Sequence, residues 1–473
     1  MVSHRIAGAP LDFAALRAEL EVPGDFTSAA LADAAHAAET VPEASWVDSA
    51  FDDATDIPFV TIDPAGSRDL DQAVHLASDG DGYLVSYAIA DVASFVRPGA
   101  ALDAETQTRG ETLYFPDTRV PLHPPSLSEG AASLLPDQVR HAVLWRIRLD
   151  ATGDVTSVDL RRARVRSRAQ LDYVAVQKSM TDGSLPAAIA LLAEVGTLRI
   201  ALARQRHAIN LDLPEQQVAG DAQHGWTMAV RPHLPVESYN AEISILTGMC
   251  AATLMLDAGY GILRTVPPAS HSTVAALRRA ARALGVAWPQ GAAPGDVLAT
   301  LDRGNARQVA LMEHAASLLR GAGYTVFDGT RPQQPLHAGI AAPYAHVTAP
   351  LRRLADRYAS EICLAAQAKR SVPAWVRDAL PTLPATMDDA DRRAHEVDRA
   401  VVDMTEAWLL RDRVGQVFTA SVIDADERAG TVVLDEPPVR ARCDGSALPV
   451  GERIDVRLAE ADVATRTVRF ERA

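Results

Sequence analysis

The aspartates of residues 61–76, TIDPAGSRDLDQAVHL, are the side chains whose types and spacing best suit chemistry. An apolar run, IPFVTI, leads into Asp63, a turn of small residues follows, and Asp69 and Asp71 come directly before a second apolar run. If the second run is extended, Asp69 and Asp71 point to the same side, and the turn can bring Asp63 back beside them. Converging carboxylates repel one another unless a cation neutralises them or they spread into water. Hard oxygen ligands in this number suit Mg²⁺ or Mn²⁺, and such sites act on phosphates.

The same spacing also fits a solvated turn, because Asp and Gly are ordinary turn residues. In that interpretation the three aspartates have no chemical role. Spacing alone leaves the metal-binding cluster and the aspartate-rich turn open.

The segments that must position these aspartates predict an α+β fold. From about residue 57, apolar or alternating runs separated by Gly and Asp turns predict strands. Segments with helical character follow at 186–205, 238–258, 272–284, 306–322, 350–369 and 387–411. We therefore expect a large domain over 51–410, with a central β-sheet and surrounding helices.

Both ends of the chain predict smaller units. Residues 1–50 predict a small helical module, similar in outline to a helix–turn–helix or winged helix, with helices at 11–20 and 27–39. Residues 41–56 predict an irregular linker. Residues 411–473 predict five short strands, the size and strand number of an OB-fold barrel, which commonly binds oligonucleotides. A small barrel that only packs on its neighbour fits the same pattern.

Composition limits the partners. The net charge of −15 and the pI of about 5.3 argue against a protein that coats nucleic acid through bulk electrostatics. They leave room for an enzyme that threads RNA through a locally basic channel. No stretch reaches the ~18 consecutive apolar residues of a membrane helix, and the start lacks the pattern of a signal peptide, so we expect no membrane association. The three cysteines form no CxxC pair, which fits a reducing cytoplasm.

Five ordered motifs resemble those of the ribonuclease II (RNB) family. Residues 61–76 are similar to its signature, in which T-I-D is followed by D-x-D-D, although Gln72 stands where the family usually has a fourth aspartate. The other four motifs are YAIADVASFV (87–96), RGETLYFPDTRVPLHPPSLSE (109–129), AEISILTGMCAA (241–252) and YAHVTAPLRRLADRYASEI (344–362). The C-terminal strands resemble the S1-type OB-fold domain of the same family. The resemblance covers residues 55–473.

The resemblance implies a 3′-to-5′ exoribonuclease that releases nucleoside 5′-monophosphates. Asp63, Asp69, Asp71 and Gln72 would hold the metal, Mg²⁺ or alternatively Mn²⁺, with Asp69 and Asp71 counted as catalytic. The amide of Gln72 brings no negative charge, so one metal position is expected to be weaker. Arg352 would stabilise the charge that grows on the phosphoryl oxygens, a task that suits a planar guanidinium.

Substrate contacts are implied for four further residues. Tyr114 would stack on or position the terminal nucleotides, and Glu242 would contact the terminal ribose and its 2′-hydroxyl. Arg109 and Arg353 would also bind the RNA. Without the resemblance, Tyr114 fits a core position and Glu242 a first-turn residue of a helix. In the same way, Arg352 fits an ion pair with Asp356 four residues on.

The expected partners are single-stranded RNA 3′ ends and, as a hypothesis, structured RNA. Family members usually carry two cold-shock-type OB domains before the catalytic domain, whereas about 50 residues precede it in this sequence. A five-stranded barrel needs roughly 70 residues. A more open channel that lets the enzyme trim close to, or into, a duplex is the hypothesis that follows. A monomer is expected, because one chain forms the channel.

Two other functions stay open at the sequence level. A catalytically weak, RNA-binding relative would use the same channel, but it would be expected to lose several motif residues, and only Gln72 is altered. A hydrolase of another phosphodiester is the third candidate. The C-terminal barrel argues against it, because small substrates do not need an oligonucleotide-binding module.

Overall fold

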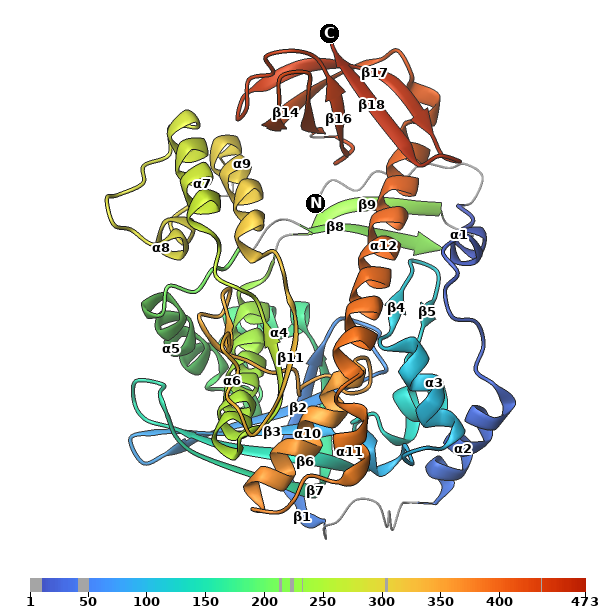
Figure 1. Cartoon of the computed structure of the whole chain (residues 1–473), viewed down its shortest axis with the longest axis vertical. Helices are drawn as coiled ribbons and strands as arrows, with labels where there is room; N and C mark the ends of the chain where they lie inside the picture. Colours follow the sequence, from blue (N-terminus) through green and yellow to red (C-terminus); the bar gives the residue numbers. More distant parts are fainter. Residues whose placement is uncertain are drawn as a thin grey trace.

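The computed structural model describes residues 11–40, 51–211, 215–221, 225–231, 233–302, 305–434 and 436–473. Its lower half is built on a closed five-stranded barrel with the strand order β1-β2-β3-β6-β7 (Figure 1). These strands are β1 (Asp52–Asp63), β2 (Gln72–Asp79), β3 (Gly82–Ala90), β6 (Val139–Leu149) and β7 (Val155–Asp172). Neighbouring strands run antiparallel, except that β7 closes the barrel by pairing parallel with β1. The predicted mixed fold with a central sheet is therefore confirmed.

The main hydrophobic core lies between this barrel and two long helices, α6 (Pro235–Ala258) and α10 (Leu354–Gln367). Trp145 and Tyr87 on the strands and Tyr358 on α10 are almost fully buried in it. By length and composition α6 is apolar enough to cross a membrane, and half of its most apolar stretch is buried inside the protein. That burial is what a core helix shows, because such a helix is apolar on all sides.

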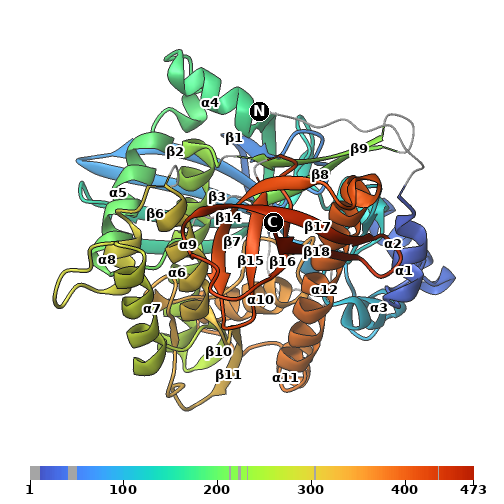
Figure 2. The same cartoon turned by 90° about the horizontal axis from the view of Figure 1, so that it is seen from above.

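A second barrel forms the top of the molecule and rests on the long helix α12 (Leu383–Leu410), which rises to it from the lower half (Figure 1). Its strand order is β14-β15-β16-β18-β17, and Leu410 at the end of α12 is buried in its core. The strands are β14 (Val417–Ala425), β15 (Ala429–Leu434), β16 (Arg440–Asp444), β17 (Arg453–Asp462) and β18 (Thr467–Arg472). Seen from above, this barrel lies over the middle of the molecule (Figure 2). The predicted five-stranded C-terminal barrel is confirmed.

The remaining elements surround these two barrels. The helices are α3 (Ala101–Arg109), α4 (Tyr173–Thr181), α5 (Leu192–Gln205), α7 (His271–Ala283), α8 (Pro294–Leu298), α9 (Ala306–Ala315) and α11 (Ala374–Ala379). Two-stranded sheets are formed by β4 (Leu113–Tyr114) with β5 (Arg119–Val120), and by β8 (Glu215–Asp221) with β9 (Gly225–Arg231). Two more pair β10 (Tyr260–Thr265) with β11 (Gly323–Asp328), and β12 (Leu336–His337) with β13 (Ala342–Pro343). The helix predicted over 306–322 is shorter, because α9 ends at Ala315 and a 3₁₀ turn, Ala316–Leu319, follows it.

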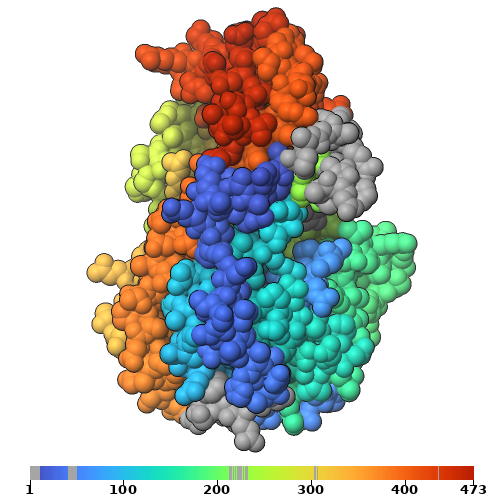
Figure 3. Space-filling view, turned by 90° about the vertical axis from the view of Figure 1, so that its right-hand side faces the viewer, coloured from blue at the N-terminus to red at the C-terminus, as the bar shows by residue number. Residues whose placement is uncertain are grey.

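Both predicted N-terminal helices form, as α1 (Phe13–Glu19) and α2 (Ser28–Glu39), and Thr27 caps the second. They do not pack as a helix–turn–helix, because they bury their apolar faces in different places. Buried α1 residues pack with α12 and the β8–β9 hairpin, whereas α2 lies against α3 and the turn Leu127–Ala131, and its buried residues belong to the hydrophobic cluster of the lower barrel. Figure 3 shows this segment as a band that runs down one face from beneath the upper barrel. Part of the predicted linker, 41–50, lies outside the described residues, and its end is already strand, because β1 begins at Asp52.

Helix α1 ties three distant parts of the chain together. Arg17 forms a two-point ion pair with Asp117 in the β4–β5 turn, at 2.7 and 3.0 Å. Glu19 forms another with Arg466 of the upper barrel, with both contacts at 2.7 Å. The ring of Phe13 packs edge-on against Trp226 of β9, with centroids 5.0 Å apart. The N-terminal segment therefore acts as a strap and not as a separate module in the described part of the chain.

A buried ion network fixes α10 against the lower barrel. Arg162 on β7 donates through Nε to Asp91 at 2.8 Å and through Nη2 to Glu361 on α10. The side chains of all three residues are at most 3% exposed. Because the loop before α10 reaches the candidate site described below, this network sets the distance between that loop and the strands.

We predict that Arg162→Met destabilises the protein by about 3–5 kcal/mol, because it leaves two buried carboxylates without a counter-charge. The neighbouring Arg161 is a matched control, since it pairs with Asp52 and Asp159 but its side chain is 47% exposed. Arg161→Met should cost no more than about 1 kcal/mol. Urea unfolding followed by circular dichroism measures both values, and equal losses for the two variants would contradict the role given to the network.

Candidate active site

One pocket of about 1010 Å³ brings together most of the predicted site residues. Those that line it are Asp63, Asp69, Asp71, Gln72, Tyr114 and Arg352. Asp63 is the last residue of β1, and Asp71 directly precedes β2. Because β1 and β2 are antiparallel neighbours, the turn between them brings Asp69 and Asp71 back beside Asp63. Arg352 and Tyr114 come from segments far along the chain.

Asp63 is held at the edge of the barrel with one oxygen unpartnered. Its Oδ2 is buried and has no hydrogen-bond partner. The pKa of Asp63 is raised to about 6, mainly by burial; the Thr61 hydroxyl lowers it, the charge of Asp69 raises it, and the charge of Arg352 lowers it by less. A buried carboxylate oxygen without a partner costs free energy, so this position favours a proton or a cation.

Asp71 is the most deeply placed of the three, with 5% of its surface exposed. Its Oδ1 accepts a hydrogen bond of 2.7 Å from the backbone N–H of Leu351, and its Oδ2 lies 3.6 Å from Nε of Arg352. Burial nevertheless raises the pKa of Asp71 to about 8. Desolvation therefore outweighs the attraction of one half-exposed arginine.

Asp69 is engaged by the β4–β5 hairpin. Its Oδ1 accepts a 2.6 Å hydrogen bond from Nη1 of Arg119, and its Oδ2 accepts one of 3.2 Å from the Tyr114 hydroxyl. The other end of the Arg119 guanidinium contacts Glu129 at 3.1 Å. Sequence reasoning missed Arg119, although it lies within the quoted motif 109–129, because no spacing rule ties it to an aspartate 50 residues away.

Gln72 is fixed by the protein at both ends of its amide. Its Nε2 donates to the carbonyl of Thr348 at 2.7 Å, and its Oε1 accepts from the Tyr87 hydroxyl. The predicted metal-ligating role of Gln72 therefore finds no support in this geometry. The side chain instead ties β2 to the loop before α10.

That loop approaches α6 closely, which brings Arg352 to the pocket. A Cβ on Gly248 of α6 would lie 2.2 Å from the ring of Tyr344, so only glycine allows the approach. Asp356 accepts from the backbone N–H of Ala349 at 2.6 Å and holds Arg353 through two contacts of 2.9 Å. The sequence offered an ion pair between Arg352 and Asp356, whereas in the structure Arg353 makes this pair.

Two predicted substrate-binding arginines have protein partners in this structure, so their contact with RNA stays a prediction. Arg353 is occupied by Asp356 and does not line the pocket. Arg109 is 2% exposed, binds Glu105 and the carbonyl of Gly24, and lies with its guanidinium 3.7 Å from the ring centroid of Phe26. A sequence motif marks these residues as important but does not say whether they face a ligand or the core.

The predicted ribose contact, Glu242, also lies away from the aspartates. It is buried on α6, where burial raises its pKa and the charges of Arg199 and Arg206 on and after α5 lower it. It is not among the residues that line the pocket of the aspartates. The geometry therefore gives Glu242 no contact with a nucleotide bound there.

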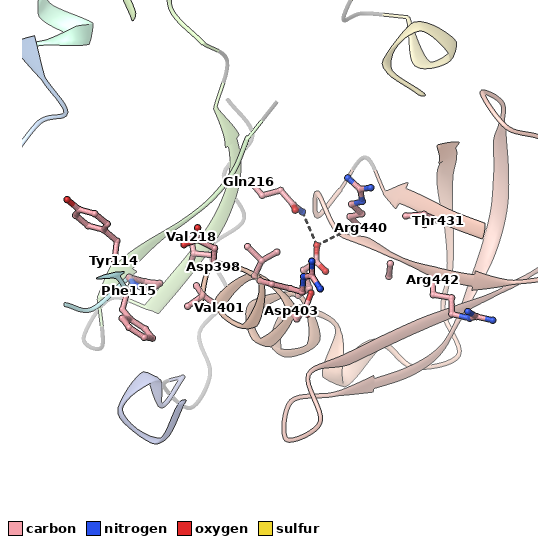
Figure 4. Close-up of a pocket in the computed structure, with 15 residues that line it drawn as sticks. Tyr114, Phe115, Gln216, Val218, Asp398, Val401, Asp403, Thr431, Arg440 and Arg442 are labelled. Carbon is pink, nitrogen blue, oxygen red and sulfur yellow. Dashed lines mark hydrogen bonds between the residues drawn. The ribbon is translucent and has the colours of Figure 1, made fainter. Parts of the chain in front are cut away.

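A second pocket, of about 880 Å³, adjoins the first and was not predicted. Both pockets are lined by Tyr114, Phe115 and Pro116. Figure 4 shows Tyr114 and Phe115 at one end, and Thr431, Arg440 and Arg442 of the upper barrel at the other. Glu406 of α12 accepts from Gln216 of β8 at 2.8 Å and from the backbone N–H of Arg440 at 2.7 Å, which joins hairpin, helix and barrel at this pocket.

The pocket of the aspartates fits a divalent cation in its chemistry. It offers hard carboxylate oxygens, an unpartnered buried oxygen on Asp63, and an excess of acids over arginines, which are the features such an ion satisfies. Within the described ranges, however, no three His, Cys, Asp or Glu side chains form a ready-made metal site. Both carboxylate oxygens of Asp69 accept hydrogen bonds from the β4–β5 hairpin, one from Arg119 and one from Tyr114.

Comparisons with known proteins agree with this architecture. The RNB domain family matches residues 51–367, and the RNase II-type exonuclease C-terminal S1 domain matches residues 416–473. Ribonuclease R of Escherichia coli is 26% identical over 506 residues, covering 95% of this chain. The chain spans 60% of the length of that relative.

Solved structures share the fold at low sequence identity. Ribonuclease R of Mycoplasma genitalium gives TM-scores of 0.87 in complex with ribose-methylated single-stranded RNA and 0.83 with double-stranded RNA. The identities are 19% and 20%, and the matches cover 98% of this chain and 78% and 83% of those chains. Yeast Ssd1, described as a pseudonuclease, gives 0.68 at 17% identity, over 88% of this chain and 52% of that one. These similarities establish the fold alone, since both active and inactive proteins adopt it.

The raised pKa of Asp71 predicts a specific pH dependence of stability for the metal-free protein. The carboxyl has a pKa of about 8 in the folded state, above its ordinary value of 3.8, so folding favours its protonated form. Its contribution is full below the ordinary pKa and is lost as pH rises towards 8. Asp71→Asn removes this loss, so the variant should gain stability over the wild type by a few kcal/mol (order of magnitude) between pH 4 and pH 8. Urea unfolding in EDTA measures the difference, and parallel curves for the two proteins would refute the assignment.

Proposed function

The chain belongs to the RNB family, and we propose that it is a 3′-to-5′ exoribonuclease that releases nucleoside 5′-monophosphates. The observation that carries this proposal is the meeting of Asp63, Asp69 and Asp71 with Arg352 in one pocket beside an exposed Tyr114. Carboxylates for a metal, a cation for the phosphate and an aromatic ring for a base are the groups that phosphodiester hydrolysis at an RNA end requires.

Nucleases of this family depend on divalent metal ions, and Mg²⁺ is the ion we propose, with Mn²⁺ as a substitute. Asp63 and Asp71 would hold it, together with Asp69 once that carboxylate leaves Arg119. When bound, such an ion activates water and neutralises charge on the phosphate. Gln72 is left out of the proposed ligand set, because Tyr87 and Thr348 hold both ends of its amide and fix it between β2 and the loop before α10.

Arg352 and Tyr114 would act directly on the RNA. The Arg352 side chain is 42% exposed and lies beside Asp71, so its guanidinium can reach a phosphate bound in the pocket. It would stabilise the charge that develops on the phosphoryl oxygens. Tyr114 is 48% exposed, and its ring would stack on a base without regard to sequence.

The RNA strand would follow the second pocket from the upper barrel to the aspartates. That pocket carries Arg440 and Arg442 at the barrel and shares Tyr114 and Phe115 with the first. A net charge of −15 weakens long-range attraction, so these local arginines would supply the backbone contacts. Single-stranded 3′ ends are the proposed substrate, and structured RNA is a second class, since the Mycoplasma relative was solved with both kinds of RNA. We propose a monomer that acts in the cytoplasm.

A catalytically inactive RNA-binding protein is the competing function, because Ssd1 shares the fold as a pseudonuclease. The three aspartates and Arg352 favour catalysis. A protein that only binds RNA has no need of buried carboxylates whose raised pKa values mark an energetic cost. A small-substrate phosphodiesterase is disfavoured by the second pocket, which leads away to the barrel.

We predict that 5′-labelled single-stranded RNA is shortened in a ladder from its 3′ end in Mg²⁺ or Mn²⁺. Asp71→Asn should lower the rate by at least about a thousandfold, since it removes a carboxylate from the proposed metal site. A gel time course measures both, with Asp79→Asn as the matched control, because Asp79 lies at the far end of β2 and pairs with Arg148. RNA binding without shortening in either metal would favour the competing function.

A second prediction concerns structured RNA. A hairpin with a single-stranded 3′ tail should be trimmed until its stem reaches the rim of the two pockets, because only the strand inside them must be single-stranded. The same hairpin without a tail should be degraded far more slowly. The stop positions are read on a sequencing gel beside those of Escherichia coli ribonuclease R. Stops no closer to the stem than those of that relative would count against access to duplex regions.

A further inference from the structure

Arg119 holds Asp69 in a position that excludes it from a metal site. Its Nη1 lies 2.6 Å from Oδ1 of Asp69, while the Tyr114 hydroxyl occupies Oδ2 at 3.2 Å. Both donors belong to the β4–β5 hairpin. An oxygen that accepts a short charge-assisted hydrogen bond cannot at the same time give its charge fully to a cation. The hairpin and a metal ion therefore compete for the same carboxylate.

The charges around the pocket explain why an arginine sits there. Its lining includes Asp63, Asp69, Asp71, Asp117 and Glu129, against the two arginines Arg119 and Arg352. Asp117 is already neutralised by Arg17 of α1. Arg119 is the cation that directly compensates Asp69, so it does in this structure what a bound dication would otherwise do.

The guanidinium has a second anchor that keeps it at the pocket when Asp69 leaves. Its Nη2 contacts Oε1 of Glu129 at 3.1 Å, and Glu129 also lines the pocket. The side chain is 28% exposed, so its freed N–H groups would face the space where RNA is expected. A guanidinium with one carboxylate released can bind a phosphate through two parallel hydrogen bonds.

We propose that Arg119 is a positioning residue that exchanges Asp69 for a phosphate of the RNA backbone when a divalent ion takes Asp69. This inference rests on the proposed function. The metal ion frees Arg119 for the phosphate, and the phosphate frees Asp69 for the metal ion, so each ligand should strengthen the binding of the other. Such coupling must be equal in both directions. Metal bound without RNA leaves Arg119 without its phosphate, so neither ligand alone gains the full contact.

The test measures Mn²⁺ binding without turnover. The probe is Mn²⁺ alone, titrated by electron paramagnetic resonance, with and without a ribose-methylated single-stranded oligonucleotide shown by gel to stay intact. The wild type should bind Mn²⁺ roughly fivefold or more tightly when the oligonucleotide is present. In Arg119→Met, Mn²⁺ should bind more tightly than in the wild type without oligonucleotide, because the competitor is gone. The oligonucleotide should then add little.

Two further variants separate exchange from mere structural support. Arg17→Met breaks the neighbouring ion pair to Asp117 on the same hairpin but keeps the contact of Arg119 with Asp69. It frees the carboxylate of Asp117, which lines the pocket, so Mn²⁺ should bind more tightly to the same degree with and without oligonucleotide, and the coupling ratio should stay at the wild-type value. Arg119→Lys keeps a charge that can serve Asp69 and the phosphate in turn, so it should restore part of the coupling lost in Arg119→Met. If Arg119 only stabilised the hairpin, lysine would not be expected to restore the coupling between Mn²⁺ and oligonucleotide binding.

Several results would overturn the inference. For Arg119→Met, these results are Mn²⁺ binding without oligonucleotide that is unchanged or weaker, and coupling that persists. For the wild type, they are the absence of coupling and the absence of Mn²⁺ binding. A wild type that shows the predicted coupling but does not hydrolyse RNA would refute the exoribonuclease proposal and still support the exchange. The two proposals therefore fail in distinguishable ways.

Discussion

Gathering three carboxylates in one pocket is the constraint on which the rest of this structure depends. Asp63 and Asp71 both have raised pKa values, and desolvation is the main cause in each case. The protein offsets this cost with donors that come from far along the chain: the Leu351 N–H, the guanidinium of Arg352, and Arg119 on the β4–β5 hairpin. Each donor must be held where the carboxylates need it. The barrel, the loop before α10 and the hairpin are therefore coupled through the site they form.

Separate contacts fix each of these parts. The network of Arg162, Asp91 and Glu361 holds α10 to β7, and with it the loop that carries Arg352. Helix α1 holds the hairpin through Asp117 and the upper barrel through Arg466. The pocket that leads to the aspartates lies between those same parts, so the contacts that stabilise the fold also define the path proposed for RNA. A change in ionic strength should act on the exposed pairs of α1 before it acts on the buried network.

Sequence reasoning identified the features that depend on local pattern and missed those that depend on long-range partners. The C-terminal barrel, most helices and the shared pocket of the aspartates follow from periodicity, turns and motif order. Spacing cannot tell which of two adjacent arginines faces a ligand, and in the structure Arg353 pairs with Asp356 while Arg352 lies in the pocket. The role of Glu242 came from the resemblance alone, and the structure places Glu242 on α6 apart from the residues that line the pocket of the aspartates. Arg119 was missed because its partner is 50 residues away.

The central claim is that water attacks the terminal phosphodiester of an RNA 3′ end in the pocket of the aspartates. Digestion of single-stranded RNA in ¹⁸O-labelled water, followed by mass spectrometry of the products under single-turnover conditions, tests it most directly. The account predicts nucleoside 5′-monophosphates that carry one ¹⁸O atom on the phosphate, released while the 5′ part of the RNA stays intact. Products that end in 3′-phosphates, internal fragments without mononucleotides, or monophosphates without the label would contradict it.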